Sequence, residues 1–110
     1  MIDRPRVVSG KGGIVTFTVV ARYTVTDGHT DRLLDLLRQV REETLKEPGC
    51  ISYEPHRSTD DENVFFIVER YQEAADFDHH FSTPHVKDIV FGQIVPLLSD
   101  RVVTKGLPIF

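Results

Sequence analysis

The stretch ERYQEAADFDHHFSTPH, residues 69–85, brings carboxylates, a phenol and three histidines to one predicted strand-to-helix junction. Carboxylate and imidazole groups are common proton-transfer groups in enzymes, and imidazole is also a frequent metal ligand. Three interpretations are open at this point: an acid/base site, a metal site, or the polar surface of an ordinary helix.

The strand before the junction favours acid/base chemistry. Glu69 and Tyr71 are two residues apart, so both side chains point to the same face of that strand. If helices cover this face, burial raises the pKa of Glu69 and allows proton exchange near neutral pH. Among the histidines of the following helix, His80 is best placed to lie opposite Glu69. The structural alternative is that Glu69 only forms an ion pair with Arg57 or Arg22.

The spacing of the histidines argues against a metal site. His79 and His80 are adjacent, and therefore lie on different sides of a helix. His80 and His85 are separated by a proline and lack the i, i+4 spacing of helical zinc sites. The only cysteine, Cys50, begins a predicted strand, where cysteine is usually a small buried hydrophobe. The sequence therefore predicts no metal, and it gives little support to nucleophilic catalysis.

Apolar periodicity predicts the element order β-α-β-β-α-β. Pro55 cannot donate a backbone hydrogen bond, which places its strand at a sheet edge. A break in the second helix is expected near Pro84. The expected segments are a strand in residues 13–28, a helix in 29–49, a hairpin of strands in 50–58 and 63–72, a helical region in 73–98, and a last strand with a tail in 100–110.

This order is that of an α+β, ferredoxin-like split β-α-β fold: a four-stranded antiparallel sheet with both helices on one face. The first and third strands are apolar or β-branched on both faces, as the pairs Val19, Val20 and Phe65, Phe66 illustrate. A second apolar face left in water would be a patch of a kind that monomers avoid. We therefore expect a homodimer whose sheets face each other.

Composition sets the remaining limits. The 110 residues suffice for one domain, expected over residues 14–110 after a flexible lead-in at 1–13. The net charge of -4 gives no basic surface for nucleic acid. No apolar run is long enough to span a membrane, the N-terminus lacks the apolar core of a signal peptide, and a single cysteine suits a reducing compartment. These features predict a cytoplasmic protein.

Three segments, VVARYTVTDG, EPGCISYE and FFIVERYQEAADFDHHFSTPHV, resemble the antibiotic biosynthesis monooxygenase family. The resemblance runs from about Val15 to Leu98. It implies a dimeric α+β barrel with a small-molecule pocket between sheet and helices in each subunit. Family members include oxygenases that need no metal or flavin, haem-degrading oxygenases and a few isomerases. Ala21 and Tyr71 stand where the better-defined oxygenases often carry asparagine and tryptophan, which argues against haem degradation.

The resulting hypothesis is a cofactor-independent monooxygenase that acts with dioxygen on a phenolic, quinol or polyketide-like aromatic molecule. His80 and Glu69 are the predicted catalytic pair. Two alternatives stay open: an isomerase or lyase that enolises a small polar metabolite, and a non-catalytic module that binds a small ligand. The residues predicted to contact the substrate are Tyr71, Tyr23, His56 and Phe65.

Overall fold

The computed structural model describes residues 16–110, so the predicted lead-in at residues 1–13 lies outside the described part. Within that part, no helix is both long and apolar enough to cross a membrane. The elements in chain order are β1 (Phe17–Val25), α1 (Thr30–Thr44), β2 (Cys50–Arg57), β3 (Val64–Tyr71), α2 (Ala74–Ser82), the π-helix η1 (Val86–Ile94), the 3₁₀ turn η2 (Val95–Leu97) and β4 (Leu98–Gly106).

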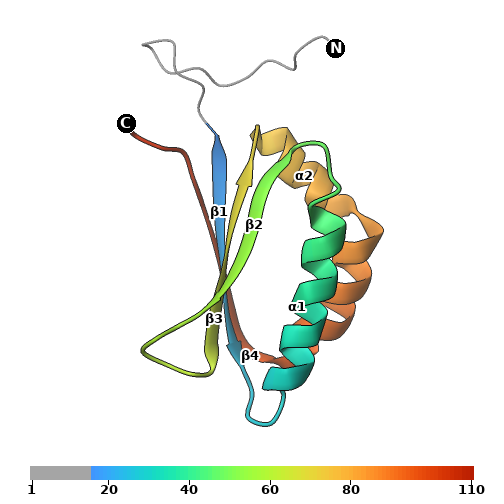
Figure 1. Ribbon diagram of the computed structural model, residues 1–110, viewed down its shortest axis with the longest axis vertical. Coiled ribbons are helices and arrows are strands. Elements are labelled where there is room, and N and C mark those ends of the chain that lie inside the picture. The colour runs from blue at the N-terminus through green and yellow to red at the C-terminus, as the bar shows by residue number, and fades with distance from the viewer. Residues whose placement is uncertain (1–15) are drawn as a thin grey trace.

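The four strands form one antiparallel sheet in the order β2-β3-β1-β4 (Figure 1). This confirms the predicted ferredoxin-like α+β class, including the edge position of the strand that contains Pro55. The helical region is interrupted between Ser82 and Val86, as expected from Pro84. Its second half is a π-helix, whose wider turn the apolar spacing did not indicate.

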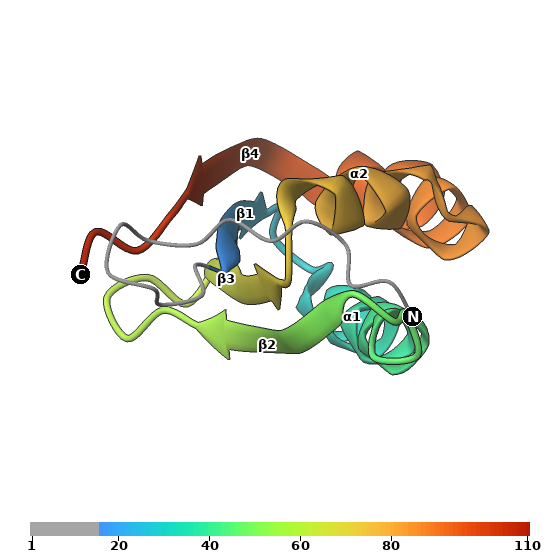
Figure 2. The same ribbon diagram turned by 90° about the horizontal axis from the view of Figure 1, so that it is seen from above.

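Helices α1, α2 and η1 lie on one side of the sheet (Figure 2). Alternate β1 residues face them and are buried, because successive side chains of a strand point to opposite faces. From α1, the residues at three- and four-residue steps enter the same core. The principal buried residues of this layer are Val19, Ala21, Tyr23, Val25, Leu33, Leu36, Leu37, Val40, Phe65, Ile67, Val86, Val90 and Ile94.

The opposite face of the sheet has an apolar centre. Val20 and Val68 are paired across β1 and β3 at its centre, and both are only partly buried. Val102 on β4, which is paired with Arg22, is 45% exposed. No helix of the described residues covers this side in Figure 2. The described chain therefore covers one sheet face itself and leaves the other, with valines at its centre and charged residues such as Arg22 and Arg70 beside them, uncovered.

The corner between α1 and β2 packs closely against the start of α2. A Cβ atom added to Gly49 would overlap the side chain of Asp76. Asp76 accepts a hydrogen bond from the backbone N–H of Glu73 at 3.0 Å and so closes the first turn of α2. Gln72 N–H donates to the carbonyl of Gly49, also at 3.0 Å. Glycine at this position lets the two chain segments touch.

We expect Gly49→Ala to lower the free energy of unfolding by about 1–3 kcal/mol, because the new methyl group must displace Asp76 from its capping position. The change is measured by urea denaturation. Gly106→Ala is the matched control, since a Cβ there meets no atom within 4 Å. Equal stability of the two variants would show that the corner is not tightly constrained.

Candidate acid/base site

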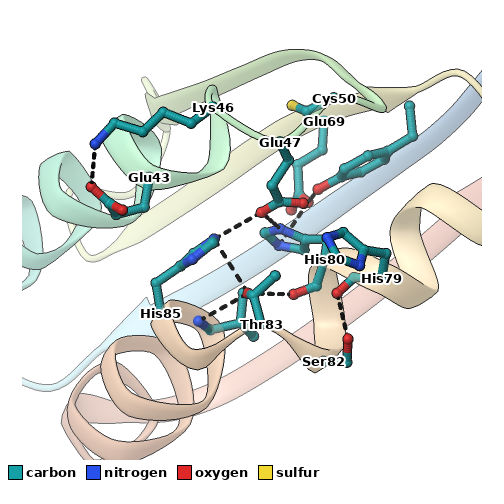
Figure 3. A network of polar contacts seen from close by, with 12 residues as sticks. Glu43, Lys46, Glu47, Cys50, Glu69, His79, His80, Ser82, Thr83 and His85 are labelled. Carbon is teal, nitrogen blue, oxygen red and sulfur yellow. Dashed lines mark hydrogen bonds and ion pairs between the residues drawn. The ribbon is translucent and has the colours of Figure 1, made fainter.

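A buried polar cluster lies where α2 crosses the end of β3 (Figure 3). Tyr71 donates a hydrogen bond to Glu69 Oε1 at 2.6 Å. His80 Nε2 lies 3.8 Å from the same Glu69 oxygen. On its other side, His80 Nδ1 bonds to Glu47 Oε2 at 2.9 Å. One imidazole is thus held between two carboxyl groups, and all four side chains are buried.

The sheet register positions Glu69 and Tyr71. Glu69 lies directly across from Val19 on β1 and Tyr53 on β2, and Tyr71 lies across from Phe17. Directly opposed residues share a face, so all of these side chains point toward the helices. Glu69 and Tyr71 therefore share one face of the sheet, as predicted, and the helices cover that face. Neither Arg57 nor Arg22 pairs with Glu69: Arg22 lies 3.7 Å from Asp100, and Arg57 bonds to the Glu62 carbonyl.

Glu47 is the residue that sequence reasoning missed. It follows the end of α1, where its N–H donates to the Thr44 carbonyl and its own carbonyl accepts from Cys50 N–H. These bonds fix the backbone and direct the side chain to α2. Glu47 is only 8% exposed, unlike an ordinary charged residue at a helix end. The one local signal was the glycine two residues later, which permits the close approach to α2.

His80 is enclosed by aromatic rings. The ring centroids of Tyr71, Tyr53 and Phe77 lie 5.5, 5.9 and 5.9 Å from that of His80. Such a wall excludes water and strengthens the electrostatic interactions inside it. Among the described residues, the polar contacts of the His80 ring are therefore those with Glu47 and Glu69.

The two carboxyl groups have different protonation behaviour. Burial raises the pKa of Glu69 to about 7, against the opposing effects of the Tyr71 hydrogen bond and of His80. For Glu47, burial also acts to raise the pKa, but hydrogen bonds and charge interactions with His80 and His85 together lower it below its usual value. Near neutral pH, Glu47 is therefore ionised while Glu69 exchanges its proton.

This difference defines the proton positions on His80. An ionised Glu47 can only accept a hydrogen bond, so Nδ1 of His80 carries the donated hydrogen. In a neutral ring, Nε2 is then the basic nitrogen, and it faces Glu69. Burial, followed by the nearby Glu69, raises the pKa of Tyr71, which keeps its hydroxyl as a donor. The cluster can accept a proton and hold it between a carboxyl group and an imidazole.

His85 also reaches this cluster, although its spacing to His80 is not that of helical zinc sites. Its Nε2 donates to Glu47 Oε2 at 2.7 Å. The potential ligand atoms of Glu47, His80 and His85 lie within 4.8 Å of one another. The contacts of His80 Nδ1 and of His85 Nε2 with Glu47 are both hydrogen bonds. The prediction that no metal binds stays a prediction.

The remaining predicted contact residues lie in other places. Tyr23 and Phe65 face the helices and are paired across β1 and β3, nearer the other end of the sheet. His56 pairs with Phe66 and stacks on its ring at 5.1 Å, so its side chain points away from the helices and from Glu69. A second missed residue is Arg101, whose positive charge opposes the rise in the pKa values of both Tyr23 and Glu69. It also lies over Phe91 at 5.0 Å.

Cys50 lies beside the cluster without acting as a nucleophile. Burial, reinforced by the nearby carboxyl groups of Glu47 and Glu69, raises the pKa of the Cys50 thiol to about 11. A thiol reacts through its thiolate, which is scarce at neutral pH under these conditions. The side chain instead donates to the Ser52 carbonyl at 3.5 Å.

Comparison with known proteins identifies the class. The sequence profile of the antibiotic biosynthesis monooxygenase family matches residues 16–90. The chain belongs to this family, as its sequence motifs predicted.

Individual relatives agree with this assignment. The solved structures of Rv0793 from Mycobacterium tuberculosis and of SO0527 from Shewanella oneidensis are each 28% identical to the chain and superpose with TM-scores of 0.80. The matches cover 86% and 84% of this chain and 96% and 90% of those proteins. An uncharacterized protein of Synechocystis sp. is 29% identical over 80 residues, or 73% of this chain. The chain spans 54% of the length of that relative.

We expect the stability of the protein to fall between pH 4.5 and 7 because of Glu69. Its pKa is about 7 in the folded protein, against an ordinary value of 4.5. In this interval the unfolded chain releases a proton that the folded protein keeps, so the contribution present at low pH is lost as pH rises. At about 1.4 kcal/mol per pH unit, the loss reaches about 3 kcal/mol.

Urea denaturation of the native protein and Glu69→Gln at several pH values isolates this effect. Subtracting the two curves cancels the titration of groups that do not interact with Glu69. The difference should change by about 3 kcal/mol in favour of the variant as pH rises. A difference independent of pH would mean that Glu69 titrates normally.

Proposed function

We propose that the protein is a dimeric oxygenase that needs no cofactor and acts on a phenolic, quinol or polyketide-like aromatic small molecule. The observation that carries this proposal is the buried contact between His80 Nε2 and Glu69 Oε1, at 3.8 Å. Membership of the antibiotic biosynthesis monooxygenase family supports the reaction class. The free thiol of Cys50 suits the reducing conditions of a cytoplasm.

The proposed reaction begins at an acidic proton, either that of a CH₂ carbon conjugated with the rings of an anthrone or that of the hydroxyl group of a phenol or quinol. The Glu69–His80 pair accepts this proton, and the electron pair left behind, which in a phenolate extends to a ring CH carbon, forms a bond from carbon to dioxygen. Return of the proton gives a hydroperoxide. Its O–O bond then breaks with loss of water, leaving a carbonyl at the same carbon. One oxygen atom enters the product and the other leaves in water, so no external reductant is consumed.

The neighbouring residues have distinct proposed roles. Glu47 is a positioning residue: it fixes the His80 ring through Nδ1 and so directs Nε2 toward Glu69. Tyr71 donates to Glu69 and limits how far burial raises its pKa. The surrounding aromatic rings keep water away from the reactive carbanion.

Replacing His80 with Ala should lower the turnover number for oxygen consumption by about 10²–10⁴-fold, the range expected for loss of a general base. The measurement uses an oxygen electrode, a panel of anthrones and quinols, and protein treated with EDTA. His79→Ala is the matched control, because His79 is adjacent but exposed. Its turnover should equal that of the native protein.

The outcomes separate the candidate functions. Equal turnover in the two histidine variants would remove His80 from the mechanism. Product formation without oxygen uptake would support the isomerase alternative. Glu47→Gln tests positioning: it should lower the turnover number at least tenfold, with KM unchanged. A loss of oxygen uptake in EDTA that added metal restores would contradict the cofactor-independent mechanism.

The dimer is proposed from the uncovered sheet face, where Val20 and Val68 are paired. Val68→Glu places a charge at the centre of this apolar face and should convert a dimer to a monomer. Sedimentation analysis measures the mass. Leu45→Glu, at an exposed position after α1, is the control and should remain dimeric. A monomeric native protein would overturn this part of the proposal.

A further inference from the structure

A groove of about 460 Å³ lies between α1 and the edge strand β2. No acidic residue lines it, although acidic residues outnumber basic ones in the chain. Its walls combine apolar and cationic side chains. The lining residues are Leu34, Leu37, Arg38, Arg41, Pro55, His56, Arg57 and Phe65.

Two of the arginines are held in place by backbone carbonyl groups. Arg41 Nε donates to the Tyr53 carbonyl at 3.2 Å, and Arg57 Nε donates to the Glu62 carbonyl at 2.9 Å. Among residues 16–110, neither guanidinium pairs with a carboxylate. Because each Nε is already engaged, the terminal nitrogens remain as donors. Planar guanidinium groups oriented in this way suit bidentate recognition of a carboxylate or phosphate.

The apolar part of the groove is partly open to solvent. Leu34 is 39% exposed, whereas Phe65 and Leu37 are buried. The Arg57 guanidinium lies over the Phe65 ring at 5.1 Å from its centroid. A ligand here would meet aliphatic side chains and Arg41 on the α1 side and Arg57 on the β2 side. An anion with an apolar body suits both the aliphatic and the cationic groups.

We propose that this groove binds a small organic anion with a flat apolar body, of the aryl carboxylate class. The site is separate from the acid/base cluster. Phe65 and Glu69 are four residues apart on β3, which corresponds to about 13 Å along the strand. The groove therefore adds a second ligand site to the proposed oxygenase function.

The test measures binding of 2-naphthoate through the fluorescence anisotropy of the ligand, using the full chain. The native protein should bind 2-naphthoate at least tenfold more tightly than the uncharged 2-naphthamide of the same shape. Binding should weaken as salt concentration rises, because exposed charges are screened. Equal affinity for the anion and the amide would overturn the proposal.

Variants locate the binding. The double variant Arg41→Gln with Arg57→Gln should bind 2-naphthoate at least tenfold more weakly. Arg32→Gln is the matched control: it removes the same charge from α1 but lies outside the groove. Leu34→Glu introduces a negative charge at an exposed position of the wall and should also abolish binding. Unchanged affinity in the double variant would overturn the proposal, as would no binding by the native protein.

His80→Ala separates this inference from the proposed function. It removes the proposed base but no lining residue of the groove, so it should bind 2-naphthoate like the native protein. If His80→Ala abolished binding while the double variant retained it, the ligand would occupy the acid/base cluster and the groove proposal would fail. Loss of oxygen uptake in His80→Ala with binding retained supports both proposals independently.

Discussion

The candidate site depends on one buried charge. Glu47 can remain ionised inside the protein because two imidazole groups donate hydrogen bonds to the same carboxylate oxygen, at 2.9 and 2.7 Å. Removing one partner from such a buried group typically costs about 3–5 kcal/mol. The charge on Glu47 also makes ionisation of the nearby Glu69 less favourable. Two carboxyl groups beside one imidazole therefore behave differently, because Glu47 receives hydrogen bonds from two imidazoles, whereas Glu69 receives one from the Tyr71 hydroxyl.

The chain geometry around α2 follows from this requirement. At the end of α2, the Thr83 hydroxyl donates to the His80 carbonyl at 2.7 Å, and the backbone of Thr83 is extended. The helix stops there, and Pro84 turns the chain so that His85 faces back toward Glu47. A continuous helix would place His80 and His85 on different sides. The interruption is what brings both histidines to one carboxylate, while Gly49 allows the opposite segment to approach.

Sequence patterns were sufficient for the fold and for three of the four residues of the cluster. Alternation placed Glu69 and Tyr71 on one strand face, and the structure shows that this face is the one covered by the helices. Glu47 was missed because 33 positions separate it from His80 in the sequence. The periodicity of a single helix or strand cannot predict a contact over that distance. His56 was assigned to the pocket without the strand register. That register pairs it with Phe66, so its side chain lies on the opposite face from Tyr53, which is paired with Glu69.

The sheet keeps the proton-exchanging cluster apart from the cationic groove, although both lie on its helix-covered side. Between them on β3 lies Ile67, which is fully buried and is paired with Ala21 on β1. This apolar residue pair is packed among other side chains and separates the two places along β3. The pKa of Glu69 is shifted by burial, Tyr71, His80, Arg101 and Glu47. The arginines of the groove are not among these causes. A ligand held by Arg41 and Arg57 would therefore leave the protonation of Glu69 largely unchanged, which allows the fold to bind an anion at one end of β3 while it transfers a proton at the other.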